Sequence, residues 1–267
     1  MSNAEVTSLI RVENVDAHYD SLKVLHNISF EVQARAITVI MGVSGCGKST
    51  LLKLLIGLKK PTAGNIFIDG KNLVNMNRRE LDAFRKRIGV LFQGGALFNS
   101  MTVGENIAVP LRVHTKLSEE TIRIMTQLKL EMVGLAGFED FMPSQLSGGM
   151  KKRAGLARAL AMDPEILFFD EPSSGLDPIT SAGLDNLILK LKSAFGMTIV
   201  VVTHELESAF AIADQMIVMD KGEILAQGTP EEVKKSTNER VIQFLNREPE
   251  EKYSKDSQFL EALIGKI

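Results

Sequence analysis

One glycine-rich stretch carries the clearest chemistry in this sequence. Residues 42–50 are Gly-Val-Ser-Gly-Cys-Gly-Lys-Ser-Thr and fit the pattern G-x-x-x-x-G-K-[ST], between an apolar run at 37–41 and a leucine-rich helical segment at 51–58. In such a loop the glycines let backbone N–H groups turn inward around a polyphosphate, and the following helix points its positive end at the same anion. We therefore expect Lys48 to reach the β- and γ-phosphates of a nucleotide and Ser49 to place its hydroxyl on Mg²⁺. A turn that binds nothing is disfavoured, because the whole pattern and both flanking segments are present.

Two adjacent carboxylates form the second candidate group. Residues 166–169 are apolar and are followed by Asp170 and Glu171, which places Asp170 at the carboxyl end of a buried strand, where ligands of open α/β sheets bind. Asp170 is expected to hold Mg²⁺, directly or through water. Glu171 is expected to orient and deprotonate an attacking water, a role worth about 10²–10⁴-fold in rate. A solvated strand end with two incidental acids is the alternative, and the phosphate loop in the same chain weighs against it.

A second glycine segment offers a further anion site. Residues 146–150, Leu-Ser-Gly-Gly-Met, place a hydroxyl and glycine amides just before a helix start. Serine and glycine before a helix are also common capping residues, so the segment alone is weak evidence of binding. One nucleotide does not need two such segments in one chain.

The elements that must position these groups follow from periodicity. Alternating apolar residues over 9–33 predict strands of a partly solvated antiparallel sheet. Segments 102–133 and 144–162 are mostly helical, and Pro110 is expected to break the first of them. Strands at 166–170, 197–202 and 215–220 alternate with helices at 178–195 and 206–213, the rhythm of a parallel sheet. Further elements are expected at 65–68 (strand), 77–87 (helix capped by Asn77), 88–92 (strand) and after the turn at 221–222 (a last strand pair).

Composition limits the class of protein. The 267 residues are 45% hydrophobic and 24% charged, enough for one large α/β domain or two small ones. A formal charge of −2 argues against a broad nucleic-acid surface, and no run approaches the ~18 apolar residues of a membrane span. The single cysteine, Cys46, excludes an internal disulfide and is interpreted as a packing residue; with no targeting pattern at residues 1–15, a cytoplasmic location is expected. The four histidines are too scattered for a zinc site.

Taken together, the motifs resemble those of the nucleotide-binding subunit of an ATP-binding cassette (ABC) transporter, over about residues 9–233. The resemblance implies a P-loop NTPase fold of class α/β, with a RecA-like parallel-sheet core, an antiparallel β subdomain and a helical signature subdomain at about 94–162. It divides the chain into an ATPase domain at 1–237 and an extension at 238–267. The motifs that carry it are Tyr19 (the aromatic that stacks on adenine), residues 42–49 (Walker A), Gln93 (Q-loop), 146–150 (signature), Asp170-Glu171 (Walker B), 174–177 (D-loop, with an unusual Gly175) and His204 (switch histidine).

The resemblance also implies roles. Two subunits pair head to tail as a homodimer, and the signature of one closes over the ATP held by Lys48 of the other. Catalysis is assigned to Glu171, His204, Lys48 and Gln93; ATP binding to Tyr19, Gly42, Ser44, Gly45, Cys46, Gly47, Lys48, Ser49, Thr50, Ser147, Gly148 and Gly149; Mg²⁺ binding to Ser49, Gln93 and Asp170; and the dimer interface to Asp177.

A narrower resemblance concerns the transported molecule. Residues 93–98 (Gln-Gly-Gly-Ala-Leu-Phe), 101–111 and 147–154 resemble the ATPases of Mla/Mce-type lipid transport systems. Such systems pair two ATPases, at the cytoplasmic face of the inner membrane, with two permeases and a lipid-binding Mce-domain protein, and move phospholipid or other hydrophobic molecules across a bacterial envelope. Residues 93–111 lie where the family docks its permease, and Leu97, Phe98 and Met101 suit either a groove for a permease helix or ordinary core. An uptake system for amino acids or organic solvents is the nearest alternative.

Two further expectations complete the sequence-based account. ABC-type ATPases of DNA repair, chromosome organisation or translation usually carry a long coiled-coil insertion or two cassettes, and 267 residues show neither, so no nucleic-acid partner is expected. In the extension, Phe259, Leu260, Leu263, Ile264 and Ile267 lay an apolar stripe along a short helix. We expect this helix to dock on the partner ATPase; packing on its own domain, or simple fraying, is the alternative.

Overall fold

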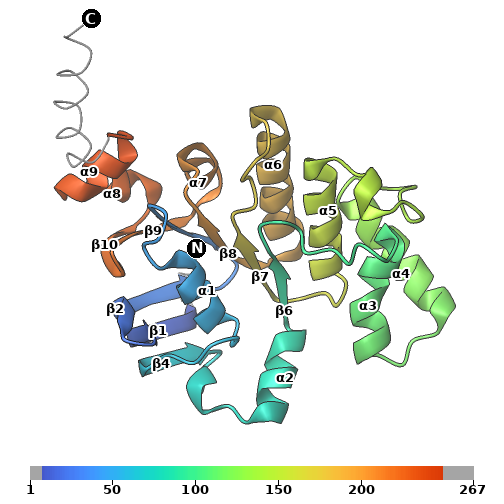
Figure 1. Cartoon of the computed structure of the whole chain (residues 1–267), viewed down its shortest axis with the longest axis horizontal. Helices are drawn as coiled ribbons and strands as arrows, with labels where there is room; N and C mark the ends of the chain where they lie inside the picture. The colour runs from blue at the N-terminus through green and yellow to red at the C-terminus, as the bar shows by residue number, and fades with distance from the viewer. Residues whose placement is uncertain (1–7, 249–267) are drawn as a thin grey trace, which may run out of the picture.

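The computed structural model of the chain describes residues 8–248, and two sheets with their helices make up this part (Figure 1). The predicted amphipathic helix at 259–267 lies outside the described residues. The antiparallel sheet has the order β2-β1-β4-β5 and consists of β1 (Ser8–Tyr19), β2 (Leu22–Gln33), β4 (Ala63–Ile68) and β5 (Lys71–Asn72). Val12, Val15 and Ala17 of β1 are buried while residues between them are exposed or half-buried, which confirms the predicted half-solvated strand.

The larger sheet has the order β10-β9-β3-β8-β7-β6. Its strands are β3 (Ile37–Gly42), β6 (Ile88–Leu91), β7 (Ile166–Asp170), β8 (Thr198–Thr203), β9 (Gln215–Asp220) and β10 (Glu223–Gly228). Only the pair β9–β10 is antiparallel in this sheet. The register sets Met41 opposite Thr203 and Asp170 opposite Val202, so the carboxyl ends of β3, β8 and β7 lie side by side. The predicted parallel core is confirmed, and this edge gathers the candidate chemical groups.

The central strands bury side chains on both faces. In β8, Ile199 and Val201 belong to one apolar cluster, whereas Val200 and Val202 belong to another. The second cluster also holds the buried leucines of α1 (Lys48–Leu55) and the inward residues of β1, β2 and β4, so α1 is packed between the two sheets. A strand buried on both faces needs a continuous apolar run, which explains the sequence of β8.

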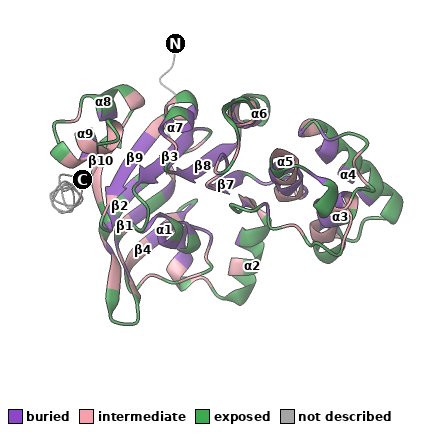
Figure 2. Cartoon of the chain, turned by 45° about the horizontal axis from the view of Figure 1, so that its top comes forward, coloured by how far each residue is buried: buried purple, intermediate pink, exposed green. Residues whose placement is uncertain are grey.

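The remaining helices cover the sheets and extend the molecule at both ends. Helices α3 (Val103–His114) and α4 (Glu119–Met132) lie beyond α5 (Gly148–Ala159) at one end, and α8 (Pro230–Lys234) and α9 (Glu239–Leu245) lie at the other (Figures 1 and 2). The others are α2 (Arg78–Lys86), α6 (Pro178–Phe195), α7 (Leu206–Ile212) and the short 3₁₀ turns η1 (Leu73–Asn75) and η2 (Pro143–Gln145). Asn77 caps α2 through a capping box with Glu80, as the sequence suggested.

The expected break at Pro110 is wrong. Helix α3 runs through Pro110, and the interruption falls instead at residues 115–118. Proline already has a helical φ and removes only one N–H donor, whereas Thr115 adopts an extended backbone and Ser118 caps α4 by accepting the N–H of Thr121. The capping residue, not the proline, therefore marks the boundary.

The beginning of the predicted extension packs on the body of the chain. Val241 of α9 is fully buried, and Phe244 packs against the larger apolar cluster. The proposed boundary at residue 237 remains a prediction. Within residues 8–248, no helix has the length and apolar character needed to cross a membrane.

Candidate functional site

The phosphate loop is pressed between the two sheets. Gly42 has φ +156°, and a Cβ there would lie 2.1 Å from the Met219 carbonyl oxygen of β9. Gly47 has φ +106°, and a Cβ there would lie 2.6 Å from Cδ2 of Leu25 in β2. Only glycine fits either position, because both the backbone conformation and the neighbouring atoms exclude a side chain. Ser44, Gly45 and Ser49 remain exposed, so the open side of the loop faces solvent.

Lys48 is folded across this loop. Its Nζ donates to the carbonyl oxygens of Gly42 (2.7 Å) and Val43 (3.1 Å), and the residue is only 7% exposed. These carbonyls hold the ammonium at the start of α1, where the helix N-terminus already favours an anion. Lys48 and the N-terminus of α1 therefore present positive charge to one place.

Cys46 packs inside the loop, as its free position in the pattern suggested. The residue is 3% exposed within the smaller apolar cluster, and burial raises the pKa of its thiol. Its carbonyl oxygen accepts the N–H of Gly222 at 3.0 Å, which ties the loop to the β9–β10 turn. A buried thiol with a raised pKa is a poor nucleophile, so the packing interpretation is confirmed.

Asp170 carries a buried oxygen that lacks a partner. Its Oδ1 is one of the few buried side-chain atoms among residues 8–248 without a hydrogen bond. Burial, followed by the nearby Glu171 charge, raises the pKa of Asp170, while Lys53 and Lys48 oppose the shift. An orphaned carboxylate oxygen beside two cations and a phosphate loop fits a cation ligand.

A magnesium ion fits the donors at this edge of the sheet. The Asp170 carboxylate, the exposed Ser49 hydroxyl and the exposed Gln93 amide all offer oxygen, the ligand atom that Mg²⁺ prefers. Residues 8–248 contain no cluster of three or more His, Cys, Asp or Glu side chains that would hold a metal by themselves. Phosphate oxygens would therefore have to complete the shell, as is usual for Mg²⁺ bound with a nucleotide.

Glu171 is held by the end of the neighbouring strand. Its Oε2 accepts the Thr203 hydroxyl (3.1 Å), the His204 N–H (3.2 Å) and a contact from His204 Nδ1 (2.9 Å). Its own N–H donates to the Val202 carbonyl at 2.8 Å, and its φ is +50°. A non-glycine residue in this region is uncommon and persists only where neighbours determine it. The structure thus brings Glu171 and His204 into direct contact.

Gln93 reaches the same region more loosely. It is exposed at the end of β6, and its Nε2 lies 3.4 Å from the Ser174 hydroxyl, in the loop after β7. This contact is at the long end for a hydrogen bond. Gln93 is therefore beside the loop that carries Glu171 without being tied to it.

The second glycine segment lies apart from the phosphate loop. Ser147 Oγ accepts the N–H of Met150 at 3.2 Å and caps α5, and a Cβ on Gly149 would lie 2.6 Å from Thr180 Cγ2 of α6. No hydrogen bond among residues 8–248 joins residues 147–149 to residues 42–50, and α5 and α1 are separated in both views (Figures 1 and 2). One chain therefore presents two glycine-rich segments that lie apart, each at the start of a helix.

Asp177 is the N-cap residue of α6 in its own chain. Its carboxylate accepts the N–H groups of Ile179 and Thr180 and the Thr180 hydroxyl (2.6 Å), and so caps α6. These hydrogen bonds, led by the Thr180 hydroxyl, lower the pKa of Asp177. The predicted interface role is not visible in a single chain.

Tyr19 is exposed at the end of β1. Its residue is 41% exposed, and the Lys59 ammonium lies 3.8 Å from the ring centroid. No local feature of the sequence indicates Lys59, which is 40 positions away and reaches the ring only through the fold. The Lys59 ammonium makes a cation–π contact with the ring, and the exposed ring can still stack on a base.

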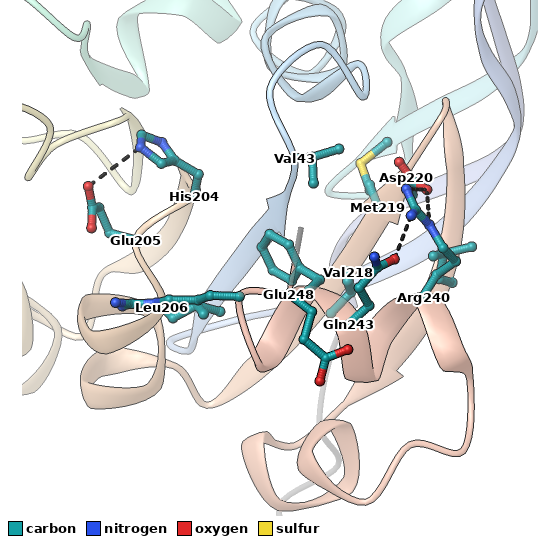
Figure 3. Close-up of a pocket in the computed structure, with 13 residues that line it drawn as sticks. Val43, His204, Glu205, Leu206, Val218, Met219, Asp220, Arg240, Gln243 and Glu248 are labelled. Atoms are coloured by element: carbon teal, nitrogen blue, oxygen red, sulfur yellow. Dashed lines mark hydrogen bonds and ion pairs between the residues drawn. The ribbon is translucent and has the colours of Figure 1, made fainter. Parts of the chain in front are cut away.

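Two features were not predicted from the sequence: the contacts of Lys152 and a cavity. Lys152 of α5 is 6% exposed and donates to three backbone carbonyls in the loop after β7. The cavity, about 410 Å³, lies between His204, the phosphate-loop residue Val43 and α9 (Figure 3). Its apolar wall includes Val218 and Phe244. Helical periodicity on α5 would have placed Lys152 on the buried side, and nothing local in the sequence indicates the cavity.

Comparisons with known proteins agree with the geometry. A family described as ABC transporter matches residues 25–174. The intermembrane phospholipid transport system ATP-binding protein MlaF of Haemophilus influenzae is 44% identical over 241 residues, 90% of this chain and 91% of that protein. The probable ribonucleotide transport ATP-binding protein mkl of Mycobacterium leprae is 43% identical over 238 residues, 89% of this chain and 68% of that protein. The dimeric post-hydrolysis state of the ATP-binding cassette MJ0796 bound to ADP and Pi is 33% identical, with TM-score 0.77 over 82% of this chain and 98% of that one.

Proposed function

Because the chain belongs to the ABC transporter family, we propose that it is the ATP-hydrolysing subunit of a transporter that moves phospholipid through a membrane permease. One observation carries the enzymatic part of the proposal. Glu171, held by Thr203 and His204, stands next to the orphaned oxygen of Asp170 at the sheet edge that also carries the phosphate loop. This arrangement provides a base, a metal ligand and a polyphosphate site at one edge.

ATP binds along the phosphate loop in this proposal. Lys48 and the inward N–H groups hold the phosphates, and Tyr19 stacks on the base with Lys59 behind it. Ser49, Gln93 and Asp170 would hold Mg²⁺, which neutralises charge on the β- and γ-phosphates when bound. The binding residues of the chain's own loop are Gly42, Ser44, Gly45, Cys46, Gly47, Lys48, Ser49 and Thr50.

Hydrolysis needs a base that can take a proton from water. Glu171 Oε2 already accepts three hydrogen bonds from Thr203 and His204, which orient the carboxylate. His204 is 44% exposed in its side chain, so it can face the nucleotide while its Nδ1 holds Glu171. Glu171 is the general base, and His204 positions it and contacts the terminal phosphate.

A dimer completes each site. The separation of residues 147–149 from residues 42–50 suits a head-to-tail pair, in which Ser147, Gly148 and Gly149 of one subunit contact the ATP of the other. Asp177, at the start of α6 beside this segment, then lies at the interface. The similar cassette described as dimeric and bound to ADP and Pi supports the pairing.

The cargo and the partners come from the relatives. Two of them are named for different cargoes, phospholipid for MlaF and, as probable, ribonucleotide for mkl, at almost equal identity. The segments 93–98, 101–111 and 147–154 support the lipid assignment through their resemblance to Mla/Mce-type ATPases. The proposal therefore includes a permease dimer, an Mce-domain lipid-binding protein and a position on the cytoplasmic face of the inner membrane.

Reconstitution tests the cargo directly. The full chain is co-purified with its permease, incorporated into vesicles that contain fluorescent phospholipid, and assayed for ATP-dependent lipid movement, with Glu171→Gln as the inactive control. Lipid movement that requires ATP and Glu171 supports the proposal. ATP-dependent movement of ribonucleotide without lipid movement contradicts it.

A further inference from the structure

Lys152 joins the signature helix to the loop that carries Glu171. The residue lies in α5 and is 6% exposed. Its Nζ donates to the carbonyl oxygens of Ser174 (2.5 Å), Pro172 (2.6 Å) and Glu171 (3.3 Å). An ammonium has three N–H donors, and here three carbonyl oxygens of the single loop after β7 accept from it.

The buried charge is balanced by backbone dipoles. None of the salt bridges among residues 8–248 includes Lys152, although the Glu171 charge raises its pKa against a larger lowering by burial. Lysine is almost never buried unless it is compensated, because a charged group loses its hydration when it leaves water. The three carbonyls supply that compensation, so Lys152 and the loop hold each other in place.

The loop is also a strained one. Glu171 has φ +50°, a conformation that is unfavourable for a non-glycine residue and must be maintained by its surroundings. Strand β8 provides part of the support through Val202 and Thr203. Lys152 provides the support that comes from α5, through the Glu171 carbonyl itself.

We propose that Lys152 is a positioning residue, through which closure of the α5 N-terminus over the partner's nucleotide sets the catalytic carboxylate Glu171 of the same chain. Lys152 is only five positions after Ser147, little more than one helical turn, so a shift of the α5 start moves the Lys152 contacts. The two composite sites of a dimer are then coupled through each chain. The inference rests on the proposed function, because it takes Glu171 as the base and Ser147 as a ligand of the partner's ATP.

Matched substitutions test the role. Lys152→Met keeps the length and removes the donors, Lys152→Arg keeps donors and charge, and Lys152→Gln keeps two donors without charge. Lys129→Met is the control, because Lys129 is 7% exposed on α4 and pairs with Asp163, away from the loop. ATP turnover is measured for the full chain assembled with its permease, beside Glu171→Gln, and thermal unfolding is measured for every variant.

We expect the Lys152 variants to lose kcat while KM for ATP is retained. Lys152→Met should lower kcat by about tenfold to a hundredfold, since a base misplaced by about 1 Å loses up to that factor. KM for ATP should stay within about twofold, because the residue touches no nucleotide. Lys152→Arg should restore most of the rate, Lys152→Gln should fall between, and Lys129→Met should resemble the wild type.

Accumulation of an ATP-bound dimer distinguishes a positioning role of Lys152 from a purely structural one. In Lys152→Met the signature helix still closes while hydrolysis is slow, so an ATP-bound dimer should accumulate in light-scattering measurements, as in Glu171→Gln. The inference is overturned by wild-type kcat in Lys152→Met and Lys152→Gln, by an equal loss in Lys129→Met, or by failure of Lys152→Gln to dimerise with ATP. Normal turnover in Glu171→Gln would instead remove the proposed base, a result distinguishable from these.

Discussion

Glu171 combines a left-handed backbone with a carboxylate that accepts three hydrogen bonds. Glu171→Gln keeps the size and much of the hydrogen bonding to Thr203 and His204 while removing the base. ATP binding should be retained, and turnover should fall by about 10²–10⁴-fold. The measurement is single-turnover hydrolysis together with nucleotide affinity, and an ATP-trapped dimer should accumulate.

Glu205→Gln is the matched control for this prediction. Glu205 directly follows His204 in the chain, and its Oε1 lies 3.5 Å from Nε2 of His204. Its removal should leave turnover within about a few-fold of wild type, because it does not hold the loop after β7. Equal losses in the two variants would mean that the local charge, not the base, is being measured.

The raised pKa of Asp170 predicts the direction in which stability changes with pH. Burial raises its pKa, so the folded chain prefers the protonated carboxyl, and the contribution of Asp170 to stability falls as pH rises from the unfolded toward the folded pKa. Above that window the buried charge lacks a hydrogen-bond partner on Oδ1. Asp170→Asn should therefore raise the unfolding midpoint of the nucleotide-free chain at pH 7 by about 2–4 °C for each 1 kcal/mol gained.

The same substitution should weaken the response to magnesium. In wild type, Mg²⁺ with ATP should stabilise the folded chain by binding it preferentially, and Asp170→Asn should lose most of that increment. Thermal unfolding at pH 7 and at pH 4, with and without Mg²⁺ and ATP, checks both parts. An Asn variant that is less stable than wild type at pH 7 without nucleotide would contradict the assignment.

Most of these residues could be predicted, and the exceptions have a physical reason. Lys48, Asp170 and His204 follow buried strands, and parallel strands bring such ends together at one edge. The contacts of Lys152 and Lys59 depend on packing between distant segments. Helical periodicity indicates that Lys152 faces inward, but no local feature of the sequence tells which distant carbonyls or ring a lysine ammonium will contact.

A substitution at the N-terminus of α5 distinguishes contact with the chain's own nucleotide from contact with the partner's nucleotide. Ser147 is exposed, and its hydroxyl caps the helix. Ser147→Arg should leave ATP affinity of the isolated chain nearly unchanged, while the bulky charge blocks dimer closure and hydrolysis. Ser147→Ala is the control, since it loses the cap, at about 1 kcal/mol, without adding bulk.

Two measurements check this prediction: ATP affinity of the monomer, and ATP-dependent dimerisation of the same variant. Loss of dimerisation in the Arg variant with retained monomer affinity is expected. Reduced monomer affinity in Ser147→Arg alone would place the segment beside the chain's own nucleotide and contradict the head-to-tail pairing.

Several element boundaries could be predicted from the sequence. The spans 166–170, 178–195 and 215–220 have the predicted ends, and Asp177 caps the second of them. Pro110 misled the interpretation, because proline is tolerated in a helix whose other contacts are retained: Leu111 beside it is buried against the larger cluster. Tertiary packing decided that boundary.

Helix α5 connects three regions that the proposal makes functional. Its start carries Ser147, its middle holds the loop of Glu171 through Lys152, and its end holds the segment after Gln93 through Arg158, which donates to the carbonyls of Ala96 (2.7 Å) and Gly95 (3.2 Å). A permease that pushes on residues 96–102 would therefore act on the same helix that closes the site.

One buried side chain, Asn106, holds residues 98–102, the segment that we expect to dock the permease. Asn106 is fully buried, and its amide contacts the backbone of Phe98, Met101 and Thr102 through four hydrogen bonds. These bonds fix residues 98–102 as a rigid surface. Phe98 is 50% exposed on it, whereas Leu97 packs against the larger core, so the two neighbouring apolar residues face different environments.

This difference gives a paired test of permease docking. Phe98→Asp should leave the folded chain and its ATP affinity intact, since half of the ring is already in water, yet should abolish co-purification with the permease. Leu97→Asp should lower the unfolding midpoint and the soluble yield, because it drives a carboxylate toward the apolar cluster. Thermal unfolding and affinity capture of the assembled transporter measure the two effects. If Phe98→Asp assembles as well as wild type, the docking surface lies elsewhere; if it unfolds as Leu97→Asp does, the ring serves the core and not the partner.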